Sequence, residues 1–274
     1  MAIILNPINP VAFSVFGLPI RWYALAYIAG FVIGFYLFRF FTKNKDSTIC
    51  LSKKQLDDFV TFIVLGVIIG GRLGYVLFYN LPFFIAHPLE IFALWHGGMS
   101  FHGGLIGVII ATFLFASKNS FADKSIARNS FRMLDILSVV APIGIGLGRI
   151  ANFINMEVMG RATNSSIGII FNGVPEYAYP RHASPIYEAM LEGLALFIIM
   201  WLCYTKTNLK TRPGAISGLL CIFYACFRIF CEQFRQPDAQ IGFLTNWGLT
   251  MGQMLSGIML IVGIIIFSCA MRKK

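Results

Sequence analysis

The sequence predicts an all-α integral membrane protein: seven transmembrane helices, an amphipathic interfacial arm and a small external cap. Hydrophobic residues make up 57% of the 274 residues and charged residues only 12%. A soluble domain carries about 25% charged residues, so this chain has too few to cover a water-exposed surface. The apolar residues also fall in long runs separated by short basic linkers. This pattern argues against a soluble globular enzyme, a DNA-binding domain and a disordered tail.

Seven apolar runs are long enough to cross a bilayer, which takes about 20 helical residues. We expect spans at about 19–41, 57–78, 99–117, 133–154, 185–204, 214–234 and 247–270. The connections are short, so residues 1–274 are expected to form a single membrane domain. The N-terminal stretch MAIILNPINPVAFSVFGLP lacks a basic region, and we therefore expect no cleaved signal peptide.

The net charge of +10 is arranged as membrane topology requires, and not as nucleic-acid binding requires. The lysines fall in short stretches between or after apolar runs, which is the positive-inside pattern of cytoplasmic loops. They occupy positions 43, 45, 53, 54, 118, 124, 206, 210, 273 and 274. The linkers 42–56, 118–132 and 205–213 and the C-terminal tail are therefore assigned to the cytoplasm. Seven spans then put the N-terminus outside and the C-terminus inside.

Two stretches assigned to the outside differ in character. Residues 81–95, LPFFIAHPLEIFALW, are amphipathic and contain two prolines, as in an arm that lies in the membrane interface. Residues from about 155 to 184 are rich in glycine, proline and aromatic residues, and we expect a small folded cap between spans four and five. Ser184 and Pro185 are interpreted as the N-cap and first residue of the fifth helix.

The six cysteines predict no chemistry of their own. None lies in the two external stretches, and no C-x-x-C spacing exists for zinc or redox work. We interpret them as small buried hydrophobic residues. Small residues at four-residue spacing, such as Gly66, Gly70 and Gly74, predict close packing of helices in lipid.

Arginine in and beside the apolar segments is the main functional signal. An arginine at bilayer depth costs about 2.5–3.5 kcal/mol on insertion scales, so it faces a cavity or a partner. Guanidinium binds phosphate through a planar fork, whereas ammonium is a point charge. Such a set suggests an anionic lipid headgroup, with pairing to carboxylates or helix-end carbonyls as the alternative. Once the arginines at the cytoplasmic side are set aside, among them Arg39 at the end of the first span, those that remain are Arg21, Arg72, Arg149, Arg161, Arg181, Arg228 and Arg235.

Two polar clusters stand out, on the fourth and sixth spans. Arg149 and Asn152 share a helix face, and Glu157 and Gly160 follow just beyond Asn155, where the helix is expected to end. The sixth span carries a polar stripe formed by Tyr224, Arg228, Glu232 and Arg235. The alternative interpretation of this stripe is an ion pair between Arg228 and Glu232 that bridges two helical turns.

His102 opens the third span beside Gly103 and Gly104, where backbone without side chains lets a large group approach. An imidazole pKa near ~6.5 suits general-base work at neutral pH, and a structural role is the alternative. His182 is interpreted as structural or as orienting the cap. Tyr23 fits an interfacial aromatic belt.

Taken together, these motifs resemble those of prolipoprotein diacylglyceryl transferases. The run SFHGGLIG at 100–107 resembles the HGGLIG segment of that family, and GRIANFIN at 148–155, followed by Glu157 and Gly160-Arg161, resembles its signature. Further matches are Trp22-Tyr23, residues 71–80, residues 181–188 and residues 227–238. The chain departs from the family pattern at Ala24, His96, Ala151, Met156 and Met159, and none of these changes removes a named polar group.

The resemblance implies a seven-span enzyme of the bacterial inner membrane. It would move the diacylglyceryl group of phosphatidylglycerol onto the lipobox cysteine of a prolipoprotein signal peptide, without a cofactor, metal or nucleic acid. The implied catalytic residues are His102, Arg149 and Arg228. The implied substrate-binding residues are Tyr23, Asn152, Glu157, Gly160 and Glu232. Arg72, Tyr224, Arg235 and His182 are expected to support them.

The expected chemistry fits these side chains. A thiol of pKa ~8.5 must become a thiolate to act as nucleophile, and His102 is the candidate acceptor of its proton. Charge grows on the departing phosphate, where Arg149 and Arg228 would stabilise it. A transporter or flippase for anionic lipid would use the same arginines. An intramembrane protease lacks its serine–histidine or aspartate pair here, and a CDP-alcohol phosphotransferase lacks its aspartate-rich motif.

Overall fold

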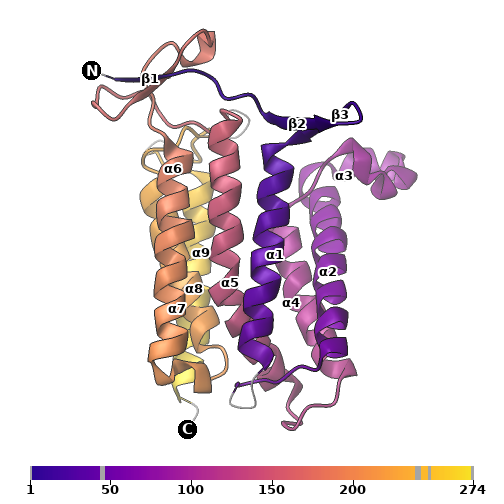
Figure 1. Cartoon of the computed structure of the whole chain (residues 1–274). Coiled ribbons are helices and arrows are strands. Elements are labelled where there is room, and N and C mark those ends of the chain that lie inside the picture. Colours follow the sequence, from indigo (N-terminus) through magenta and orange to yellow (C-terminus); the bar gives the residue numbers. More distant parts are fainter. Residues whose placement is uncertain (1, 44–46, 238–241, 246–247, 273–274) are drawn as a thin grey trace. The chain divides into compact units, whose positions relative to one another are not determined.

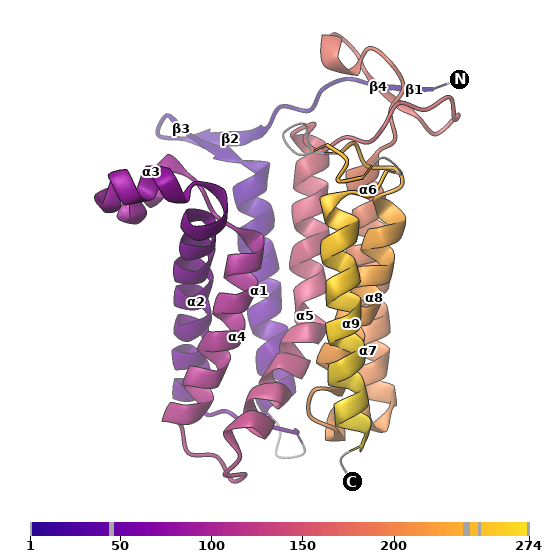
Figure 2. The ribbon, with the colours of Figure 1, turned by 180° about the vertical axis from the view of Figure 1, so that it is seen from behind.

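The computed structural model describes residues 2–43, 47–237, 242–245 and 248–272, which are mostly helical (Figures 1 and 2). Within this part of the chain, six helical segments are long and apolar enough to cross a membrane. They are α1 (Trp22–Lys43), α2 (Lys53–Tyr79), α4 (Phe101–Lys118), α5 (Ile126–Ile154), the segment Ser184–Lys206 and α9 (Met251–Arg272). The prediction of a multi-span helical membrane protein is confirmed. The sixth expected span is the shorter apolar helix α8 (Ala215–Cys231), so the number seven stays a prediction.

Several helix ends differ from the expected boundaries. Helix α2 begins at Lys53 because Ser52 forms a capping box: its hydroxyl accepts from Gln55 N (3.2 Å), and Gln55 Oε1 accepts from Ser52 N (3.0 Å). Helix α5 begins at Ile126, well before position 133, and ends at Ile154, as Asn155 indicated. Position 247 of the last expected span, and Lys45, Lys273 and Lys274 of the basic segments, lie outside the described residues.

The chain divides into two compact units: residues 39–134, and residues 1–38 with 135–274. In the first unit α2 and α4 pack backbone against backbone through their glycines. A methyl group added at Gly74 would lie 2.7 Å from Gly103 Cα, and one added at Gly70 would lie 2.8 Å from Gly107 Cα. The close packing predicted from the glycine spacing is confirmed here.

The stretch 81–95 forms three short helices in this unit: α3 (Leu81–Ala86), η1 (Pro88–Phe92) and η2 (Leu94–His96). Pro82 stands in the first turn of α3 and Pro88 begins η1. A missing N–H is tolerated at the start of a helix. Leu89, Phe92 and Trp95 are largely exposed, and the placement of this stretch in the membrane interface stays a prediction.

Four short strands within the described residues correct the prediction of an all-α protein. β2 (Val11–Val15) and β3 (Leu18–Arg21) form an antiparallel hairpin directly before α1. β1 (Ile3–Leu5) pairs in parallel with β4 (Ile169–Phe171), so that Ile3 lies opposite Ile169. The second pairing joins residues far apart in the sequence, and strands this short carry no recognisable alternation of polar and apolar residues.

The segment 155–184 contains β4, the short helix η3 (Pro175–Tyr177) and a small hydrophobic cluster of its own. The buried members of the cluster are Met159, Ile169, Phe171 and Ala183. The N-cap assignment at Ser184 is wrong by one residue. Ala183 is the N-cap, and Ser184 is the first residue of α6 (Ser184–Glu188) and donates through Oγ to Val158 O (2.8 Å).

The fifth helical segment continues from α6 through a π-helix, η4 (Ala189–Ala195), into α7 (Leu196–Lys206), which a short turn, η5 (Asn208–Thr211), joins to α8. The buried carboxylate of Asp135 on α5 lies at the start of α8. It accepts from Gly214 N (2.8 Å), Ser217 N (2.8 Å) and Ser217 Oγ (2.7 Å). Asp135 therefore caps a helix on another part of the chain, a partner that the sequence did not identify.

Candidate active site

Six charged side chains form one buried cluster in the unit of residues 1–38 and 135–274. Three arginines and three glutamates, drawn from α5, α6, η4, α8 and the turn after α8, make it up. They are Arg149, Glu188, Glu192, Arg228, Glu232 and Arg235. Buried charges are tolerated when they are paired, and here the two signs balance.

Glu188 is the centre of this cluster. Its Oε2 lies 2.9 Å from Arg149 Nε and 3.2 Å from Arg228 Nη1, and its Oε1 lies 3.6 Å from Arg235 Nη1. The Glu188 side chain is 1% exposed, whereas Arg149 is 21% exposed. One carboxylate thus orients three guanidinium groups while the arginines keep some access to the surroundings.

Glu192 and Glu232 complete the cluster. Glu192 lies one helical turn after Glu188 and contacts Arg149 Nη2 (3.4 Å) and Arg228 Nη1 (3.6 Å). Glu232 pairs with Arg228 Nη2 (2.9 Å) and accepts from Thr250 Oγ1 (2.9 Å). The ion pair between Arg228 and Glu232 that the spacing indicated is therefore present, as one of three that Arg228 makes.

The local backbone explains how the carboxylates reach the arginines. The π-helix η4 carries Glu192 and Gly193. A methyl group added at Gly193 would lie 2.6 Å from Gly146 Cα, so α5 and η4 meet backbone to backbone. Arg149 follows Gly146 by three residues and therefore lies on nearly the same face of α5, opposite Glu192. Single turns of π-helix are frequent at functional sites.

The cluster retains unused hydrogen-bonding capacity. Within the described part of the chain, both carboxylate oxygens of Glu188, Oε1 of Glu192 and Nη1 of Arg228 have no hydrogen bond of normal geometry, although all have ion-pair contacts. A buried polar atom without a hydrogen bond calls for an explanation, and a site that binds a polar ligand is one. Arg228 can still donate to an anion, and the carboxylates can still accept from hydroxyl groups.

Next to the cluster, the turn after α5 carries Glu157. Its carboxylate accepts from Asn152 Nδ2 (3.0 Å) and Asn155 Nδ2 (3.3 Å), so the expected grouping of these residues is found. Met156 and Val158, on either side of Glu157, have positive φ angles of 56° and 58°. Non-glycine residues in this region carry strain that concentrates at functional sites. No feature of the sequence predicted this backbone.

Gly160 serves close packing. A methyl group there would lie 2.7 Å from His182 Cβ and from His182 O, and would also meet Phe234 O. Gly160 N donates to His182 O (2.8 Å). The His182 ring stacks edge-on with Phe234 and lies 3.3 Å from Tyr187 Oη. These contacts fit the structural interpretation of His182 and give Gly160 a structural reason to be glycine.

The two tyrosines expected at the site, Tyr23 and Tyr224, differ in which groups lie near them. The Tyr23 hydroxyl accepts from Tyr27 Oη (3.1 Å), and it is Tyr27 that lies within electrostatic range of Arg149 and Glu157. Tyr224 lies within electrostatic range of Glu192, Arg228 and Arg149. Tyr27, one helical turn after Tyr23 in α1, therefore lies near the charged cluster.

His102 and Arg72 belong to the unit 39–134. The His102 side chain is exposed in the first turn of α4, where Ser100 Oγ accepts from Gly103 N (3.2 Å). Among described residues its ring contacts Phe101, with centroids 5.7 Å apart.

Arg72 is buried and donates all five guanidinium N–H groups to backbone carbonyls. The acceptors are the carbonyls of Glu90, Ile91, Ala93, Gly97 and Gly98. Arg72 thus fixes the loop that leads into His102 and has no donor left for a lipid phosphate.

Sequence reasoning missed the two carboxylates at the centre of the site. Glu188 appeared only as part of a matching motif, and Glu192 was not considered. The sequence did contain a signal for them. An ionisable residue inside an apolar membrane helix is functional by default, and Glu188 and Glu192 stand one turn apart in the fifth apolar run.

The helices and the buried charges define a multi-span membrane protein with a polar centre inside an apolar helical unit. A model of the family described as "Prolipoprotein diacylglyceryl transferase" matches residues 10–269. The chain belongs to this family and is therefore a transferase of the first step of lipoprotein maturation.

Relatives of known name match nearly the whole chain. A phosphatidylglycerol–prolipoprotein diacylglyceryl transferase of Bradyrhizobium diazoefficiens is 48% identical over 270 residues, covering 97% of this chain and 92% of the relative. The enzyme of the same name from Rickettsia typhi is 47% identical, with 95% and 96% covered. That from Rhodospirillum rubrum is 48% identical, with 97% and 94% covered.

Proposed function

We propose that this protein transfers the diacylglyceryl group of phosphatidylglycerol to the lipobox cysteine of prolipoproteins. The observation that carries the proposal is the pair Arg149 and Arg228, aimed from two helices and held by Glu188. Two guanidinium groups that converge on one place suit a phosphate, which accepts bidentate hydrogen bonds. The names of the relatives supply the two substrates.

In this proposal the cluster binds the headgroup. Arg228 Nη1, which has no hydrogen bond, and the partly exposed Arg149 meet the phosphate oxygens, and the unsatisfied oxygens of Glu188 and Glu192 accept from the hydroxyls of the headgroup glycerol. Glu232 and Arg235 hold the flanking arginine and glutamate in place. Asn152, Glu157 and Tyr23 would orient the headgroup and the cap.

The proposed reaction balances as a substitution at carbon. The cysteine sulfur bonds to the terminal glycerol carbon of the diacylglyceryl group, the bond from that carbon to the phosphate oxygen breaks, and glycerol phosphate leaves. The leaving phosphate gains negative charge, which Arg149 and Arg228 stabilise because their donors are already oriented. His102 accepts the thiol proton, since a thiol of pKa ~8.5 is mostly protonated at neutral pH.

The proposed topology places α8 as the seventh span, the N-terminus outside and the C-terminus in the cytoplasm of a bacterial inner membrane. The described lysines support this topology, since it places all of them on the cytoplasmic side, as the positive-inside rule requires. Lys43 ends α1, Lys53 begins α2 and Lys118 ends α4. The short helices of residues 81–96 and the cap of residues 155–184 then lie at the outer surface.

The competing proposal is a transporter for anionic lipid, which the charged cluster alone would also support. The test is to incubate purified protein, phosphatidylglycerol and a lipobox peptide, and to follow peptide mass. A mass gain of one diacylglyceryl group on the cysteine supports transfer. Lipid movement across vesicles without any modified peptide would overturn it.

The role of His102 has its own test in the same assay. We expect His102→Gln to lose roughly 10²–10⁴-fold in turnover, the usual size of a general-base contribution, while it still binds lipid. Turnover near that of the wild type would remove His102 from the mechanism and leave thiol activation to the arginines. His87→Gln, at an exposed site on the arm, is the matched control.

A further inference from the structure

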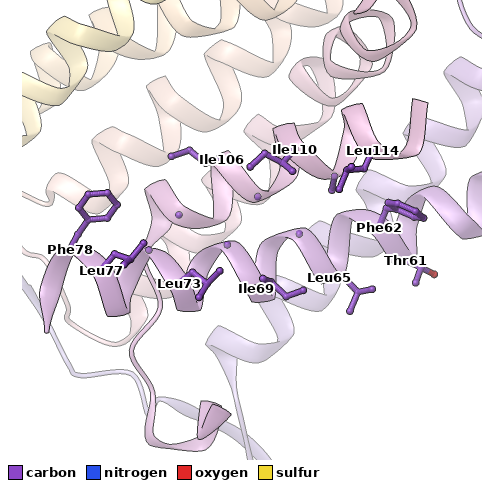
Figure 3. A pocket seen from close by; sticks show the side chains of 16 residues that line it. Thr61, Phe62, Leu65, Ile69, Leu73, Leu77, Phe78, Ile106, Ile110 and Leu114 are labelled. Atoms are coloured by element: carbon purple, nitrogen blue, oxygen red, sulfur yellow. The ribbon is translucent and has the colours of Figure 1, made fainter. Parts of the chain in front are cut away.

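A long apolar groove runs along the surface of α2 and α4 (Figure 3). Its volume is about 540 Å³. The floor consists of the glycines through which the two helices pack, and the rims are large aliphatic side chains in two rows, one from each helix (Figure 3). The α2 rim is formed by Leu65, Ile69, Leu73 and Leu77, and the α4 rim by Ile106, Ile110 and Leu114.

Both rims are helical ridges with four-residue spacing. Two such ridges with a glycine floor between them form the groove into which a ridge of another helix packs. The rim side chains are about half exposed, for example Ile69 at 55% and Ile110 at 53%. Within the described unit 39–134 these side chains therefore present an apolar surface that α2 and α4 do not bury themselves.

The groove is long enough for a helical occupant. From Thr61 to Phe78 it extends about 25 Å along α2, at 1.5 Å per residue. The apolar segment of a signal peptide, 7–15 residues long, is about 10–22 Å long as a helix and fits within it. An acyl chain of one leaflet, about 15 Å, has a similar length, so it is the ridge-and-groove shape that favours a helix as the occupant.

The position of the groove relative to His102 indicates how far along the groove a bound helix would lie. Gly103, the residue after His102, lines the groove at the end where α2 finishes and α4 begins. A helix in the groove would place the residue at its outer end beside His102. In the substrate of the proposed reaction, that residue is the cysteine that follows the apolar segment.

We propose that the α2–α4 groove is the docking site for the apolar helix of the prolipoprotein signal peptide, with the acceptor cysteine held at His102. This inference rests on the proposed function and names the site of its second substrate. Recognition would be apolar and tolerant of sequence, because the groove has no charged lining residue among those described. Chain length and hydrophobicity of the peptide segment would then set affinity.

The test fills the groove. Ile69→Trp and Ile110→Trp place a bulky ring in it at half-exposed positions, so both variants should fold. Ile68→Trp and Ile109→Trp are matched controls on the same helices, at exposed positions outside the groove. We expect the groove variants to raise KM for a peptide with its apolar segment about tenfold, equivalent to about 1.4 kcal/mol. The kcat, the KM for phosphatidylglycerol and turnover of a truncated peptide without that segment should match the controls.

Photo-crosslinking identifies the occupant. A benzophenone side chain at Leu73 should capture the apolar segment of the peptide, and the same group at Ile68 should not. Equal KM values in groove and control variants, or capture at Leu73 of lipid or of a second copy of the protein in place of peptide, would overturn the proposal. If the wild type modifies neither peptide, the proposed function has failed instead.

Discussion

The carboxylate of Glu188 lies 2.9 Å from Nε of Arg149, and this contact joins the C-terminal part of α5 to the last residue of α6. The same carboxylate contacts Arg228 and Arg235. The position of the guanidinium groups therefore depends on one buried acid.

Glu188→Gln tests this dependence. The change leaves three arginines without their shared partner, and breaking a buried ion pair by removing one member costs about 3–5 kcal/mol. We expect a lower melting temperature in detergent and loss of most transfer activity. Glu90→Gln, which breaks the exposed pair with His96 (2.8 Å), should change neither. A Glu188→Gln variant with the stability of the wild type would show that Glu192 and Glu232 hold the arginines without it.

Arg228→Lys separates binding of phosphate from charge balance. Lysine keeps the positive charge and loses the planar fork, so the variant should insert and fold yet turn over at least about tenfold more slowly. Arg149→Lys should behave alike. The double variant Arg228→Gln with Glu232→Gln should not recover activity, because Arg228 also neutralises Glu188 and Glu192. Steady-state transfer and melting temperatures in one detergent check all three, and full activity in Arg228→Lys would contradict the phosphate fork.

Gly193→Ala tests the backbone approach that aligns the site. The added methyl group would lie 2.6 Å from Gly146 Cα, which forces η4 and α5 apart and moves Glu192 from Arg149. We expect both stability and activity to fall. Gly257→Ala in α9 is the control, since among the described residues nothing beyond the backbone of its own helix lies within 4 Å of its added methyl group, and helix propensity favours alanine by about 1 kcal/mol. The prediction fails if the two variants melt at the same temperature.

A pH effect is expected at His182. Burial lowers the pKa of His182, because the charged ring loses hydration. The stability that its neutral ring contributes is therefore complete above the unfolded value near ~6.5, and it is lost as the pH falls through the folded pKa. Between pH 8 and pH 5 the wild type should lose more melting temperature than His182→Gln. Equal losses in the two proteins would show that His182 does not carry this effect.

Much of the fold could be predicted because apolar runs and basic linkers report directly on membrane spans. The shared face of Arg149 and Asn152 on α5 could be predicted too, since helical spacing fixes which side chains share a face. The pairing of β1 with β4 could not be predicted, because it joins segments far apart in the sequence and such short strands have no recognisable sequence pattern. Nor could the left-handed backbone at Met156 and Val158, since neither residue type favours it.

The sequence directed attention to the arginines, because phosphate chemistry requires cations. The structure shows Arg149 and Arg228 paired with carboxylates, the alternative given for them, and their role in phosphate binding stays a prediction. What the sequence alone did not state is that Glu188 and Glu192 face the same point from another helix. Only the packing of Gly146 against Gly193 brings the two helices to that distance.

The balance of charge in the cluster has a consequence for how the protein enters its membrane during synthesis. The segment Ser184–Lys206 carries Glu188 and Glu192, and each ionised acid at membrane depth adds about 2.5–3.5 kcal/mol to the insertion of an isolated helix. Arg149 in the preceding helix α5 lowers this penalty, because the two segments can leave the translocation channel as an ion-paired hairpin. Loss of an arginine in α5 would then appear first as a failure of biogenesis, with the fifth segment left outside the bilayer.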